Sequence, residues 1–482
     1  MVSQKDQEPK RPAKVYDTFP KLIRRNYDQW AIETALCRKK YGIWQKDSWR
    51  QYYEIVRQLS LGFISLGLER GDIVVLLGDN EPEWLWCAFA VQAANGIPAG
   101  IPLESGPDAA QYIINHSGAK FAFVTDKKQA DKFLAGNMEL PALRRIIYRN
   151  PKGLKSNADP RLLSFNDVLK LGEEYRKTHP NLFEQNLDKG SGDDTAFIAY
   201  RLNTTGQPGG IVMTYKALTA SAGGLLSRFP VQSEDHLFAS LPAASVENSY
   251  FAILPHLLTG AALNFPETPE TIAIDARETS SDFVVYDAGQ WQNLADQIKS
   301  KINGSNPLAR SCYKTMLAAG YKTADLRLSN RKPGIFRRIL NLPALWFLFN
   351  PLKDKTGLTH ARFAVTSGNI VSKETLRLML AIGVELRQTF GIGETGLVAS
   401  QNLGEIDGAT TGRPTINSEV RILNSGELLV RSDGMFSGYY KDPAKTGAVM
   451  TDGWYRTGIP AQIDDKGQLT LLHDTAAKTE GT

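Results

Sequence analysis

Apolar residues along this chain alternate between helical spacing and short continuous runs. Residues 48–68 carry apolar side chains at helical spacing, and GDIVVLLGDN (71–80) then predicts a buried strand that ends in turn residues. The alternation continues with helical segments at 84–96 and near 107–117, and with strands at 97–103, 120–125 and 144–148. Short β runs separated by helices favour a parallel sheet covered on both faces. The first part of the chain is therefore predicted to form an α/β layer.

A polar stretch around 150–194 is predicted to separate this layer from a second one. The second layer is predicted from HLFASLP (236–242), the helix-like run 252–263, and strands at 282–287, 361–367 and 384–390. Beyond about residue 410, short alternating runs flank Asn424, Ser425 and Gly426, which is typical of a β-hairpin. We expect an α/β fold with two parallel-sheet subdomains and a small β-rich unit after them.

Composition describes an ordinary globular protein. The chain has 482 residues, of which 42% are hydrophobic and 22% charged, so it can bury a large core and line a pocket. The net charge of +5 is small and the basic residues are scattered, which argues against nucleic acid as a partner. The N-terminus lacks the apolar core of a secretory signal, and no run of about 18 uncharged apolar residues occurs. These features predict a cytoplasmic protein without a transmembrane segment.

The three cysteines, Cys37, Cys87 and Cys312, are far apart and odd in number, which argues against a disulfide framework and a CxxC metal site. Residues 335–352 combine aromatic and aliphatic side chains with Arg337 and Arg338. Peripheral contact with a membrane interface is one interpretation of this segment. A buried or pocket-lining helix broken near Pro343 is the interpretation we prefer, because cores of globular proteins commonly contain such runs.

A glycine-rich loop lies between two apolar, strand-like runs in TAFIAYRLNTTGQPGGIVMTY (195–215). Gly206, Gly209 and Gly210 allow backbone N–H groups to close around an anion, and the hydroxyls of Thr204 and Thr205 add donors. The pattern predicts a phosphate site. However, no Lys or Arg lies between Asn203 and Met213 to meet the charge of a triphosphate.

A second glycine pattern, GIGETG (391–396), matches G-x-G-x-x-G after a plausible strand. It could be a dinucleotide fingerprint of an oxidoreductase, but that fingerprint needs a helix to open at the third glycine, and the following residues are polar and short. The alternative is that Glu394 lies in a tight turn at a strand end, where it could bind Mg²⁺. An exposed turn glutamate is the third interpretation. The motifs of zinc proteases, P-loop kinases and G-x-S-x-G hydrolases do not occur in the sequence.

Together with FGIGETG, GELLVRS, SGYYKDP and TDGWYRTG, the glycine-rich loop resembles the adenylate-forming (AMP-binding) superfamily, most closely its long-chain acyl-CoA synthetase branch. The order of these segments matches along nearly the whole chain. The resemblance implies a ligase that converts ATP and a fatty acid to an acyl-adenylate and then passes the acyl group to coenzyme A. It also implies a large N-terminal α/β domain with a small barrel, followed by a mobile C-terminal lid.

The resemblance also implies which residues bind the cofactors. The family's loop Y-[TS]-S-G-T-T-G-x-P-K-G corresponds to Tyr200–Gly210, and its Y-G-x-T-E motif corresponds to Phe390–Glu394. Glu394 is implied to bind Mg²⁺, and no residue is assigned a catalytic role. The residues implied to contact ATP are Thr204, Thr205, Gly206, Gly210, Gly368, Phe390, Gly391 and Glu394.

Several of the motif positions carry other residues in this chain. Gly209 replaces the loop lysine, and Ile459 replaces the aspartate of the T-G-D motif that grips the ribose hydroxyls. Losing a charged acceptor of this kind costs about 1.5–3 kcal/mol, so ATP binding is predicted to be weakened. The hinge motif D-R is Asp474 and Thr475, the chain stops soon after, and no counterpart of the lid is expected within it. The predicted divisions are 1–190, 191–405 and 406–473, with a hinge stub at 474–482.

Three functions are predicted as alternatives. The first is a weakened or non-catalytic relative of the long-chain acyl-CoA synthetases that binds a fatty acid or another acyl ligand. The second is an active acyl-adenylating enzyme, an acid–thiol ligase, whose lid is truncated or supplied by a separate protein. The third is a dinucleotide-binding oxidoreductase that uses Gly391–Gly396.

Overall fold

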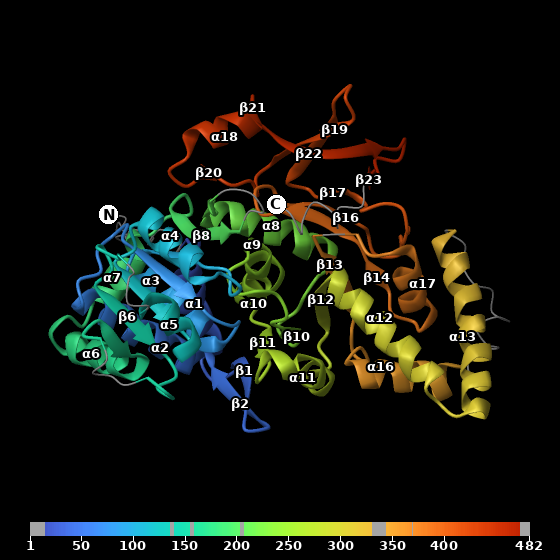
Figure 1. The fold of residues 1–482 in the computed structure, drawn as a ribbon, viewed down its shortest axis with the longest axis horizontal. Coiled ribbons are helices and arrows are strands. Elements are labelled where there is room, and N and C mark those ends of the chain that lie inside the picture. Colours follow the sequence, from blue (N-terminus) through green and yellow to red (C-terminus); the bar gives the residue numbers. More distant parts are fainter. Residues whose placement is uncertain are drawn as a thin grey trace, which may run out of the picture.

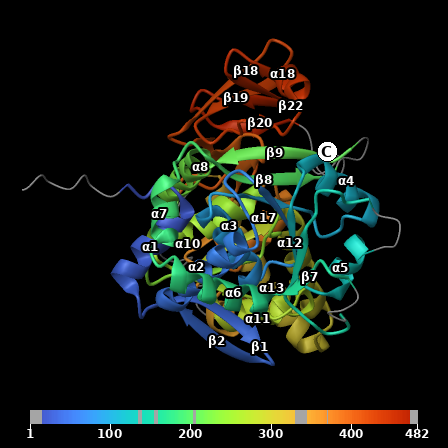
Figure 2. The same ribbon diagram turned by 90° about the vertical axis from the view of Figure 1, so that its left-hand side faces the viewer.

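The computed structural model describes residues 15–134, 139–154, 159–202, 207–329, 344–368 and 370–472. Two predominantly parallel sheets with helices around them lie side by side, and a group of antiparallel strands near the C-terminus covers one end of both (Figure 1). Figure 2 shows this C-terminal group standing over strands β8 and β9. The predicted α/β class is confirmed.

The first sheet contains eight of the described strands in the order β20-β9-β8-β4-β3-β5-β6-β7. Strands β3 to β8 run parallel, whereas β9 and β20 are added antiparallel at one edge. The bounds are β3 (Ile73–Leu77), β4 (Ile97–Gly100), β5 (Phe121–Val124), β6 (Arg145–Tyr148), β7 (Leu162–Ser164), β8 (Thr195–Arg201), β9 (Gly209–Thr214) and β20 (Gly438–Tyr439). The five residues of β3 are all buried, as expected for a strand covered on both faces.

The second sheet contains seven of the described strands in the order β14-β13-β12-β10-β11-β1-β2. All neighbours in it are parallel except the β1–β2 hairpin. The bounds are β1 (Thr34–Lys40), β2 (Ile43–Ser48), β10 (His236–Phe238), β11 (Ala262–Phe265), β12 (Phe283–Asp287), β13 (Phe363–Ser367) and β14 (Leu386–Arg387). The early β1–β2 hairpin thus joins strands from much later in the chain.

Helices cover the two sheets. Those of the first 260 residues are α1 (Phe19–Trp30), α2 (Trp49–Ser65), α3 (Pro82–Ala93), α4 (Pro107–Ser117), α5 (Lys127–Leu134), α6 (Phe165–Thr178), α7 (Leu182–Lys189), α8 (Tyr215–Arg228), α9 (Val246–Asn248), the π-helix η1 (Ser249–Ile253) and α10 (Leu254–Thr259). The later ones are η2 (Pro269–Thr271), α11 (Ile272–Thr279), α12 (Ala288–Asn303), α13 (Pro307–Leu328), the π-helix η3 (Leu345–Phe349), α16 (Asn350–Thr356), α17 (Lys373–Ala381) and α18 (Pro443–Val449). The predicted helix at 107–117 is confirmed as α4.

The C-terminal strands form two antiparallel sheets. One is β15 (Thr389–Ile392), β16 (Gly396–Ser400) and β17 (Arg413–Pro414), and the other contains β18 (Ser418–Ile422), β19 (Glu427–Ser432), β21 (Met450–Thr451), β22 (Trp454–Ile463) and β23 (Leu469–Leu471). The hairpin predicted around Gly426 is confirmed, because β18 and β19 pair antiparallel on either side of it and Gly426 takes a φ of 85°. Apolar side chains of these strands share one core around Phe390 and Leu428.

The polar stretch 150–194 does not separate two layers, contrary to the prediction. It contributes β7 to the first sheet, and its helix α6 packs directly on α2. A Cβ at Gly172 of α6 would lie 1.8 Å from the carbonyl oxygen of Gln58 in α2. The exposed faces of these helices are polar, which is why the sequence pattern looked like a linker, whereas the contact itself depends on a glycine.

Two predicted elements end earlier than their apolar runs. The helix-like run 252–263 stops at Thr259, because Gly260 adopts a φ of 84° and Ala262 begins β11. The predicted strand 384–390 is divided between two sheets, with Leu386 and Arg387 in the second parallel sheet and Thr389 already in the antiparallel sheet.

The aromatic segment around residue 345 is partly exposed. Arg337, Arg338 and Pro343 lie outside the described residues, so the predicted break cannot be placed. In η3, Leu348 and Phe349 are buried, whereas Trp346 and Phe347 are 69% and 71% exposed. No helix in the described part of the chain combines the length and apolarity needed to span a bilayer. The three cysteines are free, as predicted.

Candidate functional site

A cavity of about 670 Å³ lies between the two parallel sheets, at the carboxyl ends of strands from both. From the first sheet it is bounded by the residues that follow β3, β4, β5, β6 and β8, and from the second by those that follow β10, β11 and β12. Ligands of open α/β sheets bind at this edge, because the loops that leave parallel strands converge there. The volume is within the range of about 300–1,000 Å³ that small-molecule sites occupy.

Carboxyl groups line the end of the cavity that is formed by the residues following β3, β5 and β6. Asp79, Glu81 and Asp126 line this end together with Arg149, whose Nη2 is 3.3 Å from Oε2 of Glu81. Burial raises the pKa of Glu81 to about 8, an effect that the Arg149 charge opposes and the neighbouring carboxylates reinforce. Oε1 of Glu81 is buried without a hydrogen-bond partner. This wall of the cavity is therefore polar, and one of its buried oxygens has no hydrogen-bond partner.

The raised pKa of Glu81 predicts a pH-dependent effect of Glu81→Gln on stability. The folded protein holds a proton on Glu81 between the unfolded value of 4.5 and about 8, so Glu81 makes folding less favourable as pH rises through this window. Replacing it with the neutral amide removes that loss. We expect the Tm difference between Glu81→Gln and wild type to be more positive at about pH 8.5 than at about pH 5.5, measured by differential scanning fluorimetry. An equal difference at both pH values, or one that declines with pH, would contradict this assignment; the exposed Glu104→Gln on the same rim is the control.

The other end of the cavity contains Arg201, the last residue of β8. Its Nη2 donates to Oε1 of Glu394 over 3.2 Å, and the hydroxyl of Tyr439 donates to the same oxygen over 2.9 Å. Glu394 is 1% exposed, so it is not the exposed turn residue that one interpretation allowed. Burial and the Glu394 charge raise the pKa of the Tyr439 phenol, which keeps it a neutral donor. Arg201, Tyr439 and Glu394 therefore form one charge-assisted cluster.

Glu247 faces this cluster from α9 and also lines the cavity. Burial is the largest cause of its raised pKa, Glu394 adds to the rise, and Arg201 opposes it. The cluster thus contains one guanidinium close to two carboxyl groups, and burial favours the protonated form of Glu247. This balance leaves little negative charge to attract a further cation.

Glu394 does not fit the Mg²⁺ that the resemblance implied. One carboxylate oxygen already accepts hydrogen bonds from a guanidinium and a phenol, although Oε2 is buried without a partner. A divalent ion on Oε2 would share one carboxylate with the guanidinium that binds Oε1, and the two cations would repel each other. Among the described residues, no group of three or more His, Cys, Asp or Glu side chains could hold a metal ion.

The predicted cofactor residues that the structure describes lie on different elements. Thr204, Thr205 and Gly206 lie outside the described residues. Gly210 lies in β9, where a Cβ would be 3.2 Å from Cζ of Tyr200 and 3.2 Å from Cβ of Tyr440. Gly368 follows β13 with a φ of 76° and open space around it, and Phe390 is buried in the core of the C-terminal strands. Asp474 and Thr475 also lie outside the described residues.

The geometry of GIGETG contradicts the dinucleotide interpretation. Residues Thr389–Ile392 and Gly396–Ser400 are two antiparallel strands joined by a tight turn, so a strand and not a helix follows the third glycine. A Cβ at Gly391 would lie 2.3 Å from the carbonyl oxygen of Gly396. Close pairing of the two strands thus accounts for these glycines, and the pyrophosphate-binding helix N-terminus of the fingerprint does not form.

Ile459, which is predicted to replace the family's ribose-binding aspartate, lies within β22. Its side chain is half-buried and packs against the core of the C-terminal strands. The preceding turn is fixed by hydrogen bonds, since Thr457 Oγ1 donates to the carbonyl of Leu428 over 2.8 Å and accepts from the N–H of Ile459 over 3.0 Å. The backbone of the motif is thus held in place, while the side chain at 459 offers no hydrogen-bond acceptor.

Sequence reasoning missed two cations beside the glycine-rich loop. Arg201 lies just before the interval 203–213 that was searched, and in the sheet it pairs in register with Gly209. Lys445 comes from α18, more than 200 residues later, yet its Nζ would be 3.3 Å from a Cβ at Gly209. A wider search could have found Arg201. No sequence signal indicated Lys445, because only the pairing of β20 with β9 brings that segment to the loop.

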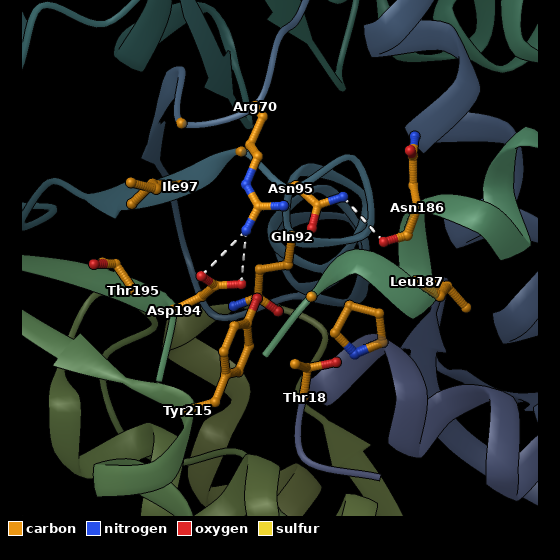
Figure 3. A pocket seen from close by; sticks show the side chains of 14 residues that line it. Thr18, Arg70, Gln92, Asn95, Ile97, Asn186, Leu187, Asp194, Thr195 and Tyr215 are labelled. Carbon is orange, nitrogen blue, oxygen red and sulfur yellow. Dashed lines mark hydrogen bonds and ion pairs between the residues drawn. The ribbon is translucent and has the colours of Figure 1, made fainter. Parts of the chain in front are cut away.

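A second, smaller pocket of about 200 Å³ lies at the opposite edge of the first sheet, near the amino ends of β4 and β8 (Figure 3). An ion pair spans it, with Arg70 Nη2 3.3 Å from Asp194, and Asn95 donates to the carbonyl of Asn186 over 3.0 Å. Its polar groups are thus largely paired with one another. The converging loops and the buried Glu81 oxygen without a hydrogen-bond partner make the larger cavity the candidate site.

Comparisons with known proteins agree with this geometry. The model of the family "AMP-binding enzyme" matches residues 23–440. The long-chain-fatty-acid–CoA ligase ACSBG2 of Homo sapiens is 24% identical over 467 residues, covering 94% of this chain and 68% of that protein. ACSBG1 of Rattus norvegicus, another long-chain-fatty-acid–CoA ligase, is 25% identical over 473 residues, covering 94% of this chain and 64% of that protein. This chain thus spans about two-thirds of the length of these relatives.

Solved structures support the same fold. The anthranilate CoA ligase AuaEII, solved with anthranoyl-AMP, superposes with a TM-score of 0.71 at 18% identity, over 96% of this chain and 79% of that one. The N-terminal domain of FACL13 from Mycobacterium tuberculosis superposes with a TM-score of 0.69 at 16% identity, over 95% of this chain and 100% of that one.

Proposed function

The chain belongs to the AMP-binding enzyme family, and we propose that it binds a fatty acid or a similar acyl ligand in the cavity between its sheets, with acyl-adenylate formation strongly impaired. The observation that carries this proposal is the position of the cavity, which extends from Arg201 and Gly393 beside the glycine-rich loop to Arg149 at the far end. An acid bound there with its carboxylate toward Arg201 would lie next to the loop that the family uses for nucleotide. Similarity to long-chain-fatty-acid–CoA ligases supports the choice of ligand.

Impaired adenylation is inferred from the nucleotide side of the site. Ile459 presents an aliphatic side chain where the family has a ribose-binding carboxylate, and Gly209 presents none where the family has a lysine. Stabilising the charge that develops on phosphate in the transition state requires preorganised donors and cations. The change at Gly209 removes a cation of this kind from the loop, and the change at Ile459 weakens the grip on the ribose, so adenylation is expected to be lowered more than binding of the acyl ligand.

The carboxylates at the far end of the cavity favour an acyl ligand with a polar or cationic group remote from its own carboxylate. Asp79, Glu81 and Asp126 would place a methyl end against a wall of polar carboxyl groups, whereas an amino or hydroxyl end could donate to Oε1 of Glu81, which has no hydrogen-bond partner. We therefore expect 12-aminododecanoic acid to compete at least as well as dodecanoic acid for this cavity. Equilibrium competition against a fluorescent fatty acid measures this order directly.

Filling the cavity tests the proposed location of the ligand. Ala244 lines the cavity and is half-buried, so Ala244→Trp is expected to occupy space that the acyl chain needs and to weaken fatty-acid binding by about tenfold or more. The same substitution at Ala318, an exposed position of α13, should leave binding unchanged. Equal affinity in wild type and Ala244→Trp would contradict the proposed location, provided both proteins unfold at the same Tm.

Pyrophosphate exchange into ATP separates the proposal from the second candidate function, an active acyl-adenylating enzyme whose lid comes from another polypeptide. With medium- and long-chain acids tested in turn, we expect exchange at the level of a protein-free blank. Rapid, acid-dependent exchange would overturn the impaired state and establish the active enzyme. In that case a lid-domain protein would be the partner to search for, and the cytoplasm the predicted place for both.

A further inference from the structure

The two cations missed in the sequence, Arg201 and Lys445, flank the strand that begins at Gly209. We propose that they bind the phosphoryl groups of an adenosine nucleotide, so that Lys445 supplies the charge of the loop lysine and Arg201 that of the divalent ion. This inference rests on the proposed function, in which the cavity lies next to the loop that the family uses for nucleotide. It adds which side chains would bind the phosphoryl groups. It predicts that this chain binds nucleotide without Mg²⁺.

Lys445 is placed to act for the missing loop lysine. A Cβ built at Gly209 would be 3.3 Å from Nζ of Lys445, so the ammonium lies where the side chain of residue 209 would begin. Its position is set by α18, where the N–H of Lys445 donates to Oδ1 of Asp442 over 2.8 Å, and by the ring of Tyr439, whose centroid is 4.4 Å from Nζ. None of the ion pairs formed within the described ranges includes Lys445. Its charge is therefore available to an anion at the loop.

Arg201 is positioned to supply the positive charge that a divalent ion would otherwise supply to the phosphoryl groups. It pairs in register with Gly209 across the β8–β9 ladder, so it borders the same loop from the other strand. One guanidinium nitrogen binds Glu394, the residue implied to hold the metal, and 40% of the Arg201 side chain remains accessible. A guanidinium presents several donors in one plane, so it can bind a carboxylate and a phosphoryl group at the same time.

Tyr439 connects the two cations. Its hydroxyl donates to Oε1 of Glu394, which also accepts from Arg201, and its ring lies beneath the ammonium of Lys445. Tyr439 belongs to β20, which pairs with β9 through Tyr439 and Ile211. The C-terminal segment β20–α18 thus supplies one cation and positions the other, and both charges lie beside Gly209.

Isothermal titration calorimetry of ATP with the whole chain, once in EDTA and once in excess Mg²⁺, tests this inference. We expect wild-type affinity to differ by less than about threefold between the two conditions, and Lys445→Ala to lower it about tenfold in both. Arg201→Thr is expected to lose affinity in EDTA and to regain it with Mg²⁺, because Glu394 is then free for the ion. Arg201→Lys retains a positive charge and should remain independent of Mg²⁺, which serves as a second variant if Arg201→Thr does not fold.

A double substitution tests whether Lys445 and a loop lysine are interchangeable. Gly209→Lys in the Lys445→Ala background should restore most of the lost affinity, whereas Gly209→Lys alone should gain less, because it places two ammonium groups side by side. Lys441→Ala is the matched control. It removes the same charge from the same segment, but the Lys441 ammonium donates to the carbonyl of His116 over 2.8 Å.

Each outcome decides between this inference and the proposed function. An absolute requirement for Mg²⁺, or equal effects of Lys445→Ala and Lys441→Ala, would overturn the inference while fatty-acid binding kept the proposed function. ATP binding in EDTA that depends on both cations, without any fatty-acid binding, would support the inference and overturn the proposed ligand. Binding of neither ATP nor fatty acid would overturn both.

Discussion

Ile459→Asp is expected to raise the affinity of this chain for ATP and AMP roughly ten- to a hundredfold, because it restores a charged acceptor for the ribose hydroxyls, an interaction that contributes about 1.5–3 kcal/mol. The backbone around residue 459 is already positioned for this by the hydrogen bonds of Thr457 with Leu428 and with the N–H of residue 459. The half-buried position in the core of the C-terminal strands means that the new carboxylate also lowers stability somewhat. Calorimetric titration with each nucleotide measures the gain.

Ile463→Asp is the matched control for this gain. It makes the same change on the same face of β22, four residues later, at a side chain that is 37% exposed. It should leave nucleotide affinity unchanged. Equal affinities for Ile459→Asp and Ile463→Asp would show that residue 459 does not face the ribose, and the correspondence with the family's T-G-D motif would be wrong.

Gly172→Ala is expected to destabilise the fold by about 3 kcal/mol or more, since the added methyl would meet the backbone of α2 and neither helix can rotate it away. The Cβ would lie 1.8 Å from the carbonyl oxygen of Gln58 and 2.9 Å from the N–H nitrogen of Gly62. Gly62 makes a second close approach from α2, because its Cβ would lie 2.3 Å from the carbonyl oxygen of Val168. The helices would have to separate and expose the apolar side chains between them, and urea denaturation should show a much lower midpoint.

Gly447→Ala is expected to stabilise the fold, the opposite of the effect expected for Gly172→Ala. Gly447 lies in α18 with no atom within 4 Å of its would-be Cβ, so alanine there only restricts the unfolded chain and favours the helix, by about 0.5–1 kcal/mol. A destabilisation of similar size at both positions would mean that glycine-to-alanine changes are harmful for a general reason. The close contact of α2 and α6 would then not be the cause.

Elements with strong apolar periodicity were predictable from the sequence. The helix at 107–117, the buried strand within 71–80 and the hairpin around Gly426 follow from local patterns of side chains, and local patterns determine such elements. The stretch 150–194 was interpreted wrongly for the same reason. The solvent-facing side of its helix α6 is polar. Gly172, which allows α6 to approach α2, does not contribute to an apolar sequence pattern.

The candidate site was less accessible to sequence reasoning. The glycine-rich loop and Glu394 could be located because they form short motifs, whereas the burial of Glu394 and its pairing with Arg201 could not. The conclusion that the loop lacks a cation was drawn from neighbouring residues only. Arg201 and Lys445 correct it, because a charge can reach the loop from any segment that the fold places beside it.

By itself, the sequence determined the alternation of helices and strands and the family resemblance, and it predicts the loss of a ribose-binding carboxylate at Ile459, since each depends on residues that are close together in the chain. Only the tertiary structure decided that strands from both halves of the chain are shared between the sheets, that the cavity lies where the carboxyl ends of both sheets meet, and that Arg201, Glu394, Tyr439 and Lys445 form one cluster. The physical reason is that charge and packing act through space, and these residues come from β8, the β15–β16 turn, β20 and α18, which lie together only in the folded chain.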